Sequence, residues 1–157
     1  MHESDFINEV KNSLLKDFRN LHYKKIPDQV FNPNAHFNPE KDYDAFICYK
    51  GCFTALEFKL HKNKNAFALD RVSLNQRSAL LDAYEASGLA YVVVGIRYEN
   101  VRKAFFIPIR NFMDFCISSE RKSMPLDVME QYRQAEWVGG GHWRIKEEWI
   151  TYTKSTI

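Results

Sequence analysis

An uninterrupted apolar run, residues 89–96, constrains the fold of this chain more than any other feature. It contains three consecutive valines, which favour an extended conformation. Alternate side chains of a strand point to opposite faces of a sheet, so a strand that is apolar throughout must be covered on both faces. The run therefore predicts a central strand in a layered α/β fold.

Helices are predicted on both sides of this strand in the chain. Residues 4–19 carry apolar side chains at helical spacing, with Ser4 as the N-cap. A second helix opens at Ser73 with capping-box spacing and ends at Gly88. Two shorter helices and one more strand are expected at residues 111–117, 126–134 and 104–107.

A β-hairpin is predicted before the second helix. Its two extended runs, residues 43–49 and 52–61, are rich in aromatic and apolar side chains and are separated by Lys50-Gly51. Residues 27–41 contain several asparagines and three prolines, which break regular structure, so an exposed loop is expected there. A chain of 157 residues has the usual size of one domain, which predicts a single domain over residues 1–157.

Composition limits the cellular setting more than the function. The three cysteines form no zinc-ligand pattern, and an odd count without a secretion signal predicts a reducing, cytoplasmic location. No apolar run approaches the roughly 20 residues that span a bilayer, so no membrane partner is expected. The net charge of +2 says almost nothing about nucleic acid, and any DNA-binding cations must be concentrated on one face.

Asp44 and Glu57 are predicted to face each other across the hairpin. The register set by a two-residue turn places them directly opposite one another. Carboxylates on neighbouring strands, with Cβ atoms about 5 Å apart, repel one another unless a cation or a shared proton lies between them. The pair therefore indicates a metal site.

Lys59 is predicted to share one face of the second strand with Glu57, because strand residues two apart point the same way. Two carboxylates, water and the Phe58 carbonyl would suit Mg²⁺ or Mn²⁺, which activates a bound water and offsets charge on a phosphodiester. The Lys59 ammonium would orient that water or stabilise the oxyanion, giving phosphodiester hydrolysis. The alternative is that Asp44 and Glu57 are solvated strand residues and that Lys59 pairs with Glu57 at the surface.

Several separate segments match one family in the same order. They are residues 44–51 (DAFICYKG), 56–59 (LEFK), 62–69 (KNKNAFAL), 75–76 (NQ) and 121–125 (RKSMP). Together they resemble RecU-type Holliday junction resolvases, members of the PD-(D/E)XK nuclease superfamily. The resemblance implies a restriction-endonuclease-like fold, in which helices flank a mixed central β-sheet. It also implies a stalk before the catalytic acid, for which residues 27–41 are short.

The resemblance also implies roles for individual residues. Asp44 and Glu57 would be metal ligands, Lys59 the catalytic lysine, and Gln76 a helper near the scissile phosphate or its metal-bound water. Gln76 has a second interpretation as the third residue of the capping box. A carboxylate of the first helix often joins such a site, and Glu9 is the candidate here, although a solvated helix face explains it equally well.

The implied substrate is branched DNA, cut by a homodimer because two symmetric cuts need two sites. Basic residues that follow the catalytic strand are candidate phosphate contacts, with a solvated loop as their alternative: Lys62, Lys64, Arg71 and Arg77. Two other functions stay open. One is a restriction or repair endonuclease of the same superfamily that cuts linear or damaged duplexes, and the other is a DNA-binding module without hydrolysis.

Overall fold

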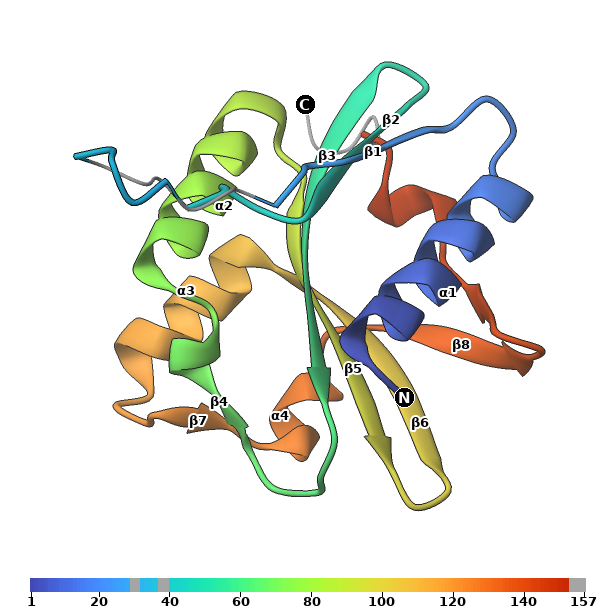
Figure 1. The fold of residues 1–157 in the computed structure, drawn as a ribbon. Coiled ribbons are helices and arrows are strands. Elements are labelled where there is room, and N and C mark those ends of the chain that lie inside the picture. The colour runs from blue at the N-terminus through green and yellow to red at the C-terminus, as the bar shows by residue number, and fades with distance from the viewer. Residues whose placement is uncertain (29–31, 37–39, 153–157) are drawn as a thin grey trace.

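A mixed seven-stranded sheet forms the centre of the molecule (Figure 1). The computed structural model describes residues 1–28, 32–36 and 40–152. The strand order is β1-β2-β3-β5-β6-β8-β9, with β3 and β5 parallel and the other neighbours antiparallel. The strands are β1 (His22–Lys25), β2 (Ala45–Tyr49), β3 (Cys52–His61), β5 (Ala90–Tyr98), β6 (Val101–Pro108), β8 (Arg133–Gly139) and β9 (His142–Arg144).

Helices cover both faces of the sheet (Figure 1). Helix α1 (Glu3–Asp17) packs on one face, and α2 (Leu74–Ser87) and α3 (Ile109–Ser118) pack on the other. The short elements are a 3-10 turn η1 (Leu69–Arg71), α4 (Leu126–Met129), a second 3-10 turn η2 (Glu147–Trp149) and a two-stranded sheet of β4 (Phe67–Ala68) and β7 (Ser123–Met124). The predicted α/β fold with a mixed sheet and flanking helices is confirmed.

Strand β5 occupies the middle of the sheet and is buried on both faces, as its apolar run predicts. Tyr91 and Val93 pack in the layer beneath α1, whereas Val92 and Val94 pack beneath α2 and α3. Position 95 requires a glycine, because a Cβ atom there would lie 2.8 Å from the Phe6 ring of α1. The close approach of α1 to β5 therefore depends on this glycine.

Gly95→Ala is expected to lower the free energy of unfolding by about 1–3 kcal/mol, the usual cost of overpacking a core. The Phe6 ring cannot move aside easily, because it is fully buried and packs edge-on against Phe58 and Trp143. Urea denaturation measures the effect. A Phe6→Leu change in the same chain removes the clash, so the double variant should lose less stability than the two single losses added together. Additive losses would contradict this packing.

Local sequence signals set two elements as predicted. The hairpin turn contains Lys50 and Gly51, both with positive φ, and its register pairs Ala45 with Leu56 and Tyr49 with Cys52. Helix α2 is also confirmed. Its N-cap Ser73 exchanges hydrogen bonds with Gln76, and Gly88 ends it in the left-handed conformation.

Four details of the sequence interpretation change. Helix α1 begins at Glu3 rather than at a Ser4 cap, and the Asp5 carboxylate accepts a hydrogen bond from the His2 backbone N–H. The helix expected at residues 126–134 ends at Met129, because the chain then pairs with β6 as strand β8. Strand β6 begins earlier than expected, at Val101. Strand β1 was not predicted at all.

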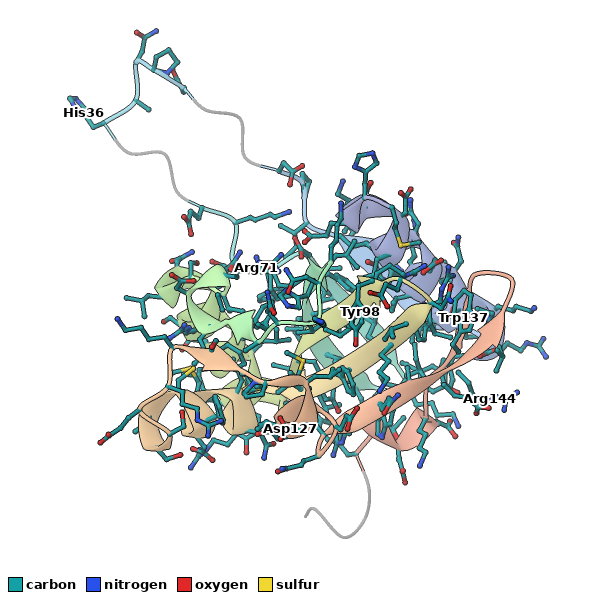
Figure 2. All side chains as sticks on the ribbon, turned by 90° about the horizontal axis from the view of Figure 1, so that it is seen from below. His36, Arg71, Tyr98, Asp127, Trp137 and Arg144 are labelled. Atoms are coloured by element: carbon teal, nitrogen blue, oxygen red, sulfur yellow. The ribbon has the colours of Figure 1, made fainter. Side chains whose placement is uncertain are left out.

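The segment of residues 27–41 lies partly outside the described residues. Its described parts contain no helix or strand, and residues 32–36 are exposed and stand away from the body of the molecule (Figure 2).

At the other end of the chain, Trp143 and Trp149 are buried, so they serve core packing. Among the described residues, none of the helices has the length and apolar character needed to cross a bilayer.

Candidate active site at the edge of strand β3

The two strands of the hairpin differ in length, which leaves one edge of β3 without a strand partner. Strand β3 has ten residues and β2 has five, so residues 57–61 extend beyond β2. Side chains satisfy the backbone groups there: Asp44 accepts a hydrogen bond from the Phe58 N–H (2.8 Å), and Glu3 accepts one from the Leu60 N–H (3.1 Å). Arg71 donates to the Leu60 carbonyl (3.0 Å). We call residues 57–61 the β3 overhang.

Asp44 is held in place by its backbone and its side chain. It directly precedes β2, and its backbone N–H donates to the Leu56 carbonyl (3.1 Å), so Asp44 and Ala45 both lie against Leu56 and the one-to-one pairing, expected to reach Asp44 and Glu57, ends at Ala45. Its Oδ2 accepts from the Phe58 N–H, and its Oδ1 lies 2.9 Å from Lys41 Nζ. The carboxylate is thus fixed against the β3 overhang.

Glu57 is a buried carboxylate, with a relative exposure of 1%. It lies with Lys59 on the face of β3 opposite to Phe58, and its Oε2 is 3.1 Å from Lys59 Nζ. Burial, followed by repulsion from Asp44, raises its pKa to about 7, although Lys59 partly offsets this increase. The alternative of solvated side chains paired at the surface is therefore wrong for Glu57.

The second oxygen of Glu57 has the properties of an unused ligand. Glu57 Oε1 is buried and has no hydrogen-bond partner among the described residues. A buried carboxylate oxygen without a hydrogen-bond partner is energetically unfavourable, and a cation bound to it would offset that cost. Within the described ranges, no three side chains of His, Cys, Asp or Glu cluster as a metal site. A metal here would therefore rely on two carboxylates, the backbone and water, which suits an oxygen-preferring ion such as Mg²⁺.

Phe58 can contribute its backbone carbonyl to such a site. In a strand, the N–H and the carbonyl of one residue point to the same edge. The Phe58 N–H points to Asp44, so its carbonyl faces the edge where Asp44 lies. The candidate ligands Asp44, Glu57 and Phe58 are consequently brought together by the hairpin alone.

Glu9 is not brought to this site. Its carboxylate accepts hydrogen bonds from Arg97 and from the Trp143 indole, each at 3.2 Å, and lies 3.9 Å from Arg102. The carboxylate of α1 that does approach the site is Glu3, which the sequence analysis missed. Glu3 lines a cavity of about 320 Å³ together with Tyr23, Lys41 and Asp44. No sequence signal separated Glu3 from Glu9, since both are polar residues of one helix.

Gln76 and Arg77 are engaged in holding the chain. Gln76 Oε1 accepts a hydrogen bond from the Ser73 N–H at 3.0 Å, which is its capping-box role. Arg77 donates to the carbonyls of Val72 (2.8 Å) and Leu69 (2.6 Å). Each side chain therefore has a structural partner, and contact with a phosphate stays a prediction for both.

The other predicted phosphate contacts lie just beyond the overhang. Lys62 and Lys64 are exposed on the turn between β3 and β4. Arg71 is half-buried, bonded to the Leu60 carbonyl and placed 5.1 Å over the Phe67 ring (Figure 2). The two lysines are exposed, so contact with a phosphate backbone stays a prediction for them, whereas Arg71 is bonded to the end of β3.

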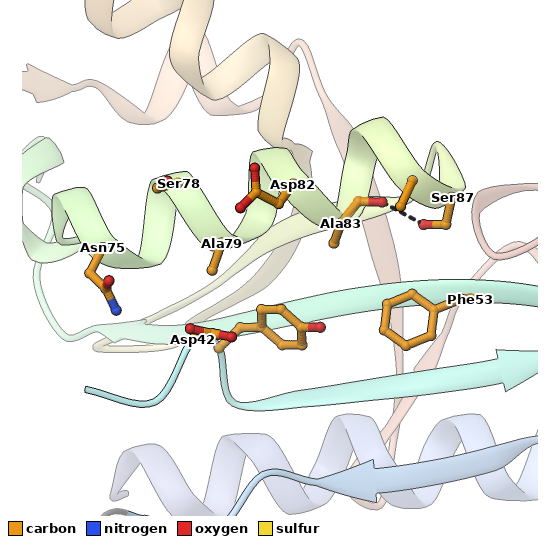
Figure 3. Close-up of a pocket in the computed structure, with 10 residues that line it drawn as sticks. Asp42, Phe53, Asn75, Ser78, Ala79, Asp82, Ala83 and Ser87 are labelled. Atoms are coloured by element: carbon orange, nitrogen blue, oxygen red, sulfur yellow. Dashed lines mark hydrogen bonds between the residues drawn. The ribbon is translucent and has the colours of Figure 1, made fainter. Parts of the chain in front are cut away.

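A cavity of about 610 Å³ lies beside the candidate site rather than in it. It lies between α2 and the hairpin, where Asp42 lies beneath Ala79 and Phe53 lies beneath Ala83 and Ser87 (Figure 3). Asp44, Glu57 and Lys59 do not line it. Asp44 instead lines the separate cavity of about 320 Å³ that Glu3 and Lys41 also line.

Comparisons with known proteins identify a matching family. Residues 9–139 match the family model described as RecU, recombination protein U. Holliday junction resolvase RecU from several Staphylococcus aureus strains, including JH9 and COL, is 26% identical over 113 residues. That match covers 65% of this chain and 53% of the relative, so the chain spans about half the length of these relatives.

A solved structure shares the fold at low sequence identity. It is the Archaeoglobus fulgidus protein Hjc, a Holliday junction resolvase, which matches with a TM-score of 0.53 and 14% identity over 83% of this chain and 94% of that one. The similarity confirms the restriction-endonuclease-like fold that was expected. Because the family model covers most of the sequence, the chain belongs to the RecU family.

Proposed function

We propose that this protein is a divalent-metal-dependent endonuclease that cuts Holliday junctions. One observation carries the proposal: Glu57 is buried with an unpartnered Oε1, beside Lys59 and close enough to Asp44 for the two carboxylates to repel. A carboxylate pair with a neighbouring ammonium at an open sheet edge suits hydrolysis of an extended phosphodiester. The family membership and the names of the relatives support the same activity.

Each residue of the site has a distinct role in this proposal. Asp44, Glu57 and the Phe58 carbonyl would hold the metal, and Mg²⁺ or Mn²⁺ suits these oxygen ligands. When bound, the metal supplies an activated water and neutralises charge on the phosphate. Lys59, anchored on Glu57, directs its ammonium toward the attacking water or the oxyanion.

The DNA would lie along the β3 overhang. Lys62 and Lys64 would contact backbone phosphates, so binding should weaken steeply as salt rises. Arg71, Arg77 and Gln76 would support this surface from η1 and the start of α2. A homodimer would supply the second site for two symmetric cuts. A single nuclease domain over residues 1–157 acting in the cytoplasm is part of the same proposal.

Cleavage of a labelled four-way junction and of matched linear duplexes tests the proposal. With Mg²⁺ or Mn²⁺, we expect paired cuts in the junction and little cutting of the duplex. The Asp44→Asn variant should cut neither substrate. Preferential cutting of the duplex would favour the restriction or repair alternative. Tight junction binding without any cleavage in either metal would favour a binding module and would overturn the proposal.

A further inference from the structure

Lys41 makes contacts that the proposed chemistry does not use. Its Nζ lies 2.9 Å from Asp44 Oδ1 and 2.7 Å from Asp28 Oδ1, so one ammonium bridges two carboxylates. The Lys41 side chain is 22% exposed and Asp44 is 15% exposed, whereas Asp28 is 78% exposed. The bridge therefore joins a shielded acid of the candidate site to an acid in solvent.

The bridge leaves both oxygens of Asp44 occupied. Oδ2 accepts the hydrogen bond from Phe58, and Oδ1 is paired with Lys41. Glu57 differs, because its Oε1 has no partner among the described residues. Each proposed carboxylate ligand is thus paired with one ammonium of the chain, Lys59 for Glu57 and Lys41 for Asp44, but only Asp44 has a partner at both of its oxygens.

A divalent ion bound at Asp44 Oδ1 would meet this ammonium at short range. Two cations on one carboxylate oxygen repel each other strongly where solvent is partly excluded. Asp28 gives the lysine another partner, since it already holds Nζ at 2.7 Å and lies toward solvent. Lys41 can therefore leave Asp44 without losing every anionic contact.

We propose that Lys41 is an internal counter-cation of the metal site. It neutralises Asp44 in the metal-free protein, and a divalent ion displaces it toward Asp28. The inference rests on the proposed function, because it takes Asp44 as a metal ligand. Because Lys41 competes with the divalent ion for Asp44, the site binds the ion more weakly than the two carboxylates alone would. Lys41 therefore raises the metal concentration at which the site fills.

Calorimetric titration with Mn²⁺ alone, without DNA, tests this role. At low ionic strength, Lys41→Met should bind Mn²⁺ about tenfold more tightly than the wild type, because one repelling charge is removed next to the ligand. Lys41→Arg keeps the charge and should stay near the wild-type affinity. Lys25→Met removes an equal charge from the same cavity, and among the ion pairs of the described residues Asp44 is joined to Lys41 and not to Lys25, so this variant should change affinity less than about twofold.

The titration separates this inference from the proposed function. If Asp44→Asn and Glu57→Gln bind Mn²⁺ as well as the wild type, or no variant binds it, the metal centre itself is wrong. If both variants lose binding while Lys41→Met shows no tightening, only the counter-cation role is overturned.

A second measurement uses the wild-type chain and so does not depend on how a variant folds. Acetylation of individual lysines by an activated ester, followed by mass spectrometry, reports how accessible each ammonium is. Saturating Mn²⁺ should raise the acetylation rate of Lys41 several-fold and leave the exposed Lys24 unchanged. An unchanged rate at Lys41 in protein that has bound Mn²⁺ would overturn the displacement.

Discussion

Replacing Lys59 with methionine is expected to slow metal-dependent junction cleavage by about 10²–10³-fold, the usual effect of removing one preorganised charge from a transition state. Methionine keeps the apolar stem of the side chain, and Lys59 is only 15% exposed, so its ammonium rather than its bulk is tested. Single-turnover cleavage at saturating protein measures the chemical step. Junction binding, measured in Ca²⁺, should change by less than about threefold, because Lys59 is largely shielded from a passing backbone.

Lys62→Met is the matched control for this prediction. It removes the same charge three residues further along the chain, from an exposed side chain. We expect weaker junction binding and a shallower salt dependence in this variant, with an almost unchanged rate once the junction is saturated. A Lys59→Met protein that cleaves at the wild-type rate would remove Lys59 from the chemistry, and equal defects in the two variants would indicate a binding role for both.

The second large effect concerns the stability of the metal-free protein. The pKa of Glu57 is raised from 4.5 to about 7, so the folded protein prefers the protonated form. Below the lower value the group is protonated in both the folded and the unfolded state and costs nothing. As the pH rises through the higher pKa, Glu57 becomes charged in the folded protein as well, and the free energy of unfolding falls by about 3 kcal/mol for a pKa shift of this size.

Glu57→Gln removes this titration and should therefore change the pH profile of stability. In the presence of a chelator, the free energy of unfolding of the variant relative to the wild type should rise by about 3 kcal/mol between about pH 4 and about pH 9. Urea denaturation at several pH values measures the difference. Glu85→Gln, on the exposed face of α2, should show no such trend. Parallel profiles for Glu57→Gln and the wild type would contradict the raised pKa.

The sequence predicted those parts of the site that depend on short-range signals. The turn at Lys50-Gly51 sets the hairpin register, which brings Asp44 to the edge of β3, where its carboxylate accepts a hydrogen bond from the Phe58 N–H. Likewise Ser73 and Gly88 set both ends of α2. In each case the determining residues lie within one element or its caps, so their effect does not depend on distant parts of the chain.

Contacts between distant segments were not predictable in this way. Residues 133 and 134 were expected to end a helix, but they pair with β6, some 30 positions earlier in the chain. Strand β1 is short, polar and mostly exposed, so neither periodicity nor apolar content marks it. The choice of Glu3 over Glu9 depends on how α1 is rotated against β5, and the contact between Phe6 and Gly95 fixes that rotation.

The difference in length between β2 and β3 bears on how this protein can evolve. Asp44 is fastened to β3 twice, through its backbone at Leu56 and through its carboxylate at Phe58. Insertions or deletions that precede Lys41 in the connection between β1 and β2 therefore need not move the acid, because these two contacts hold it to β3 and Lys41 lies only three residues before it. Under the proposed function, the connection before Lys41 can therefore vary in length while Asp44 keeps its place against β3.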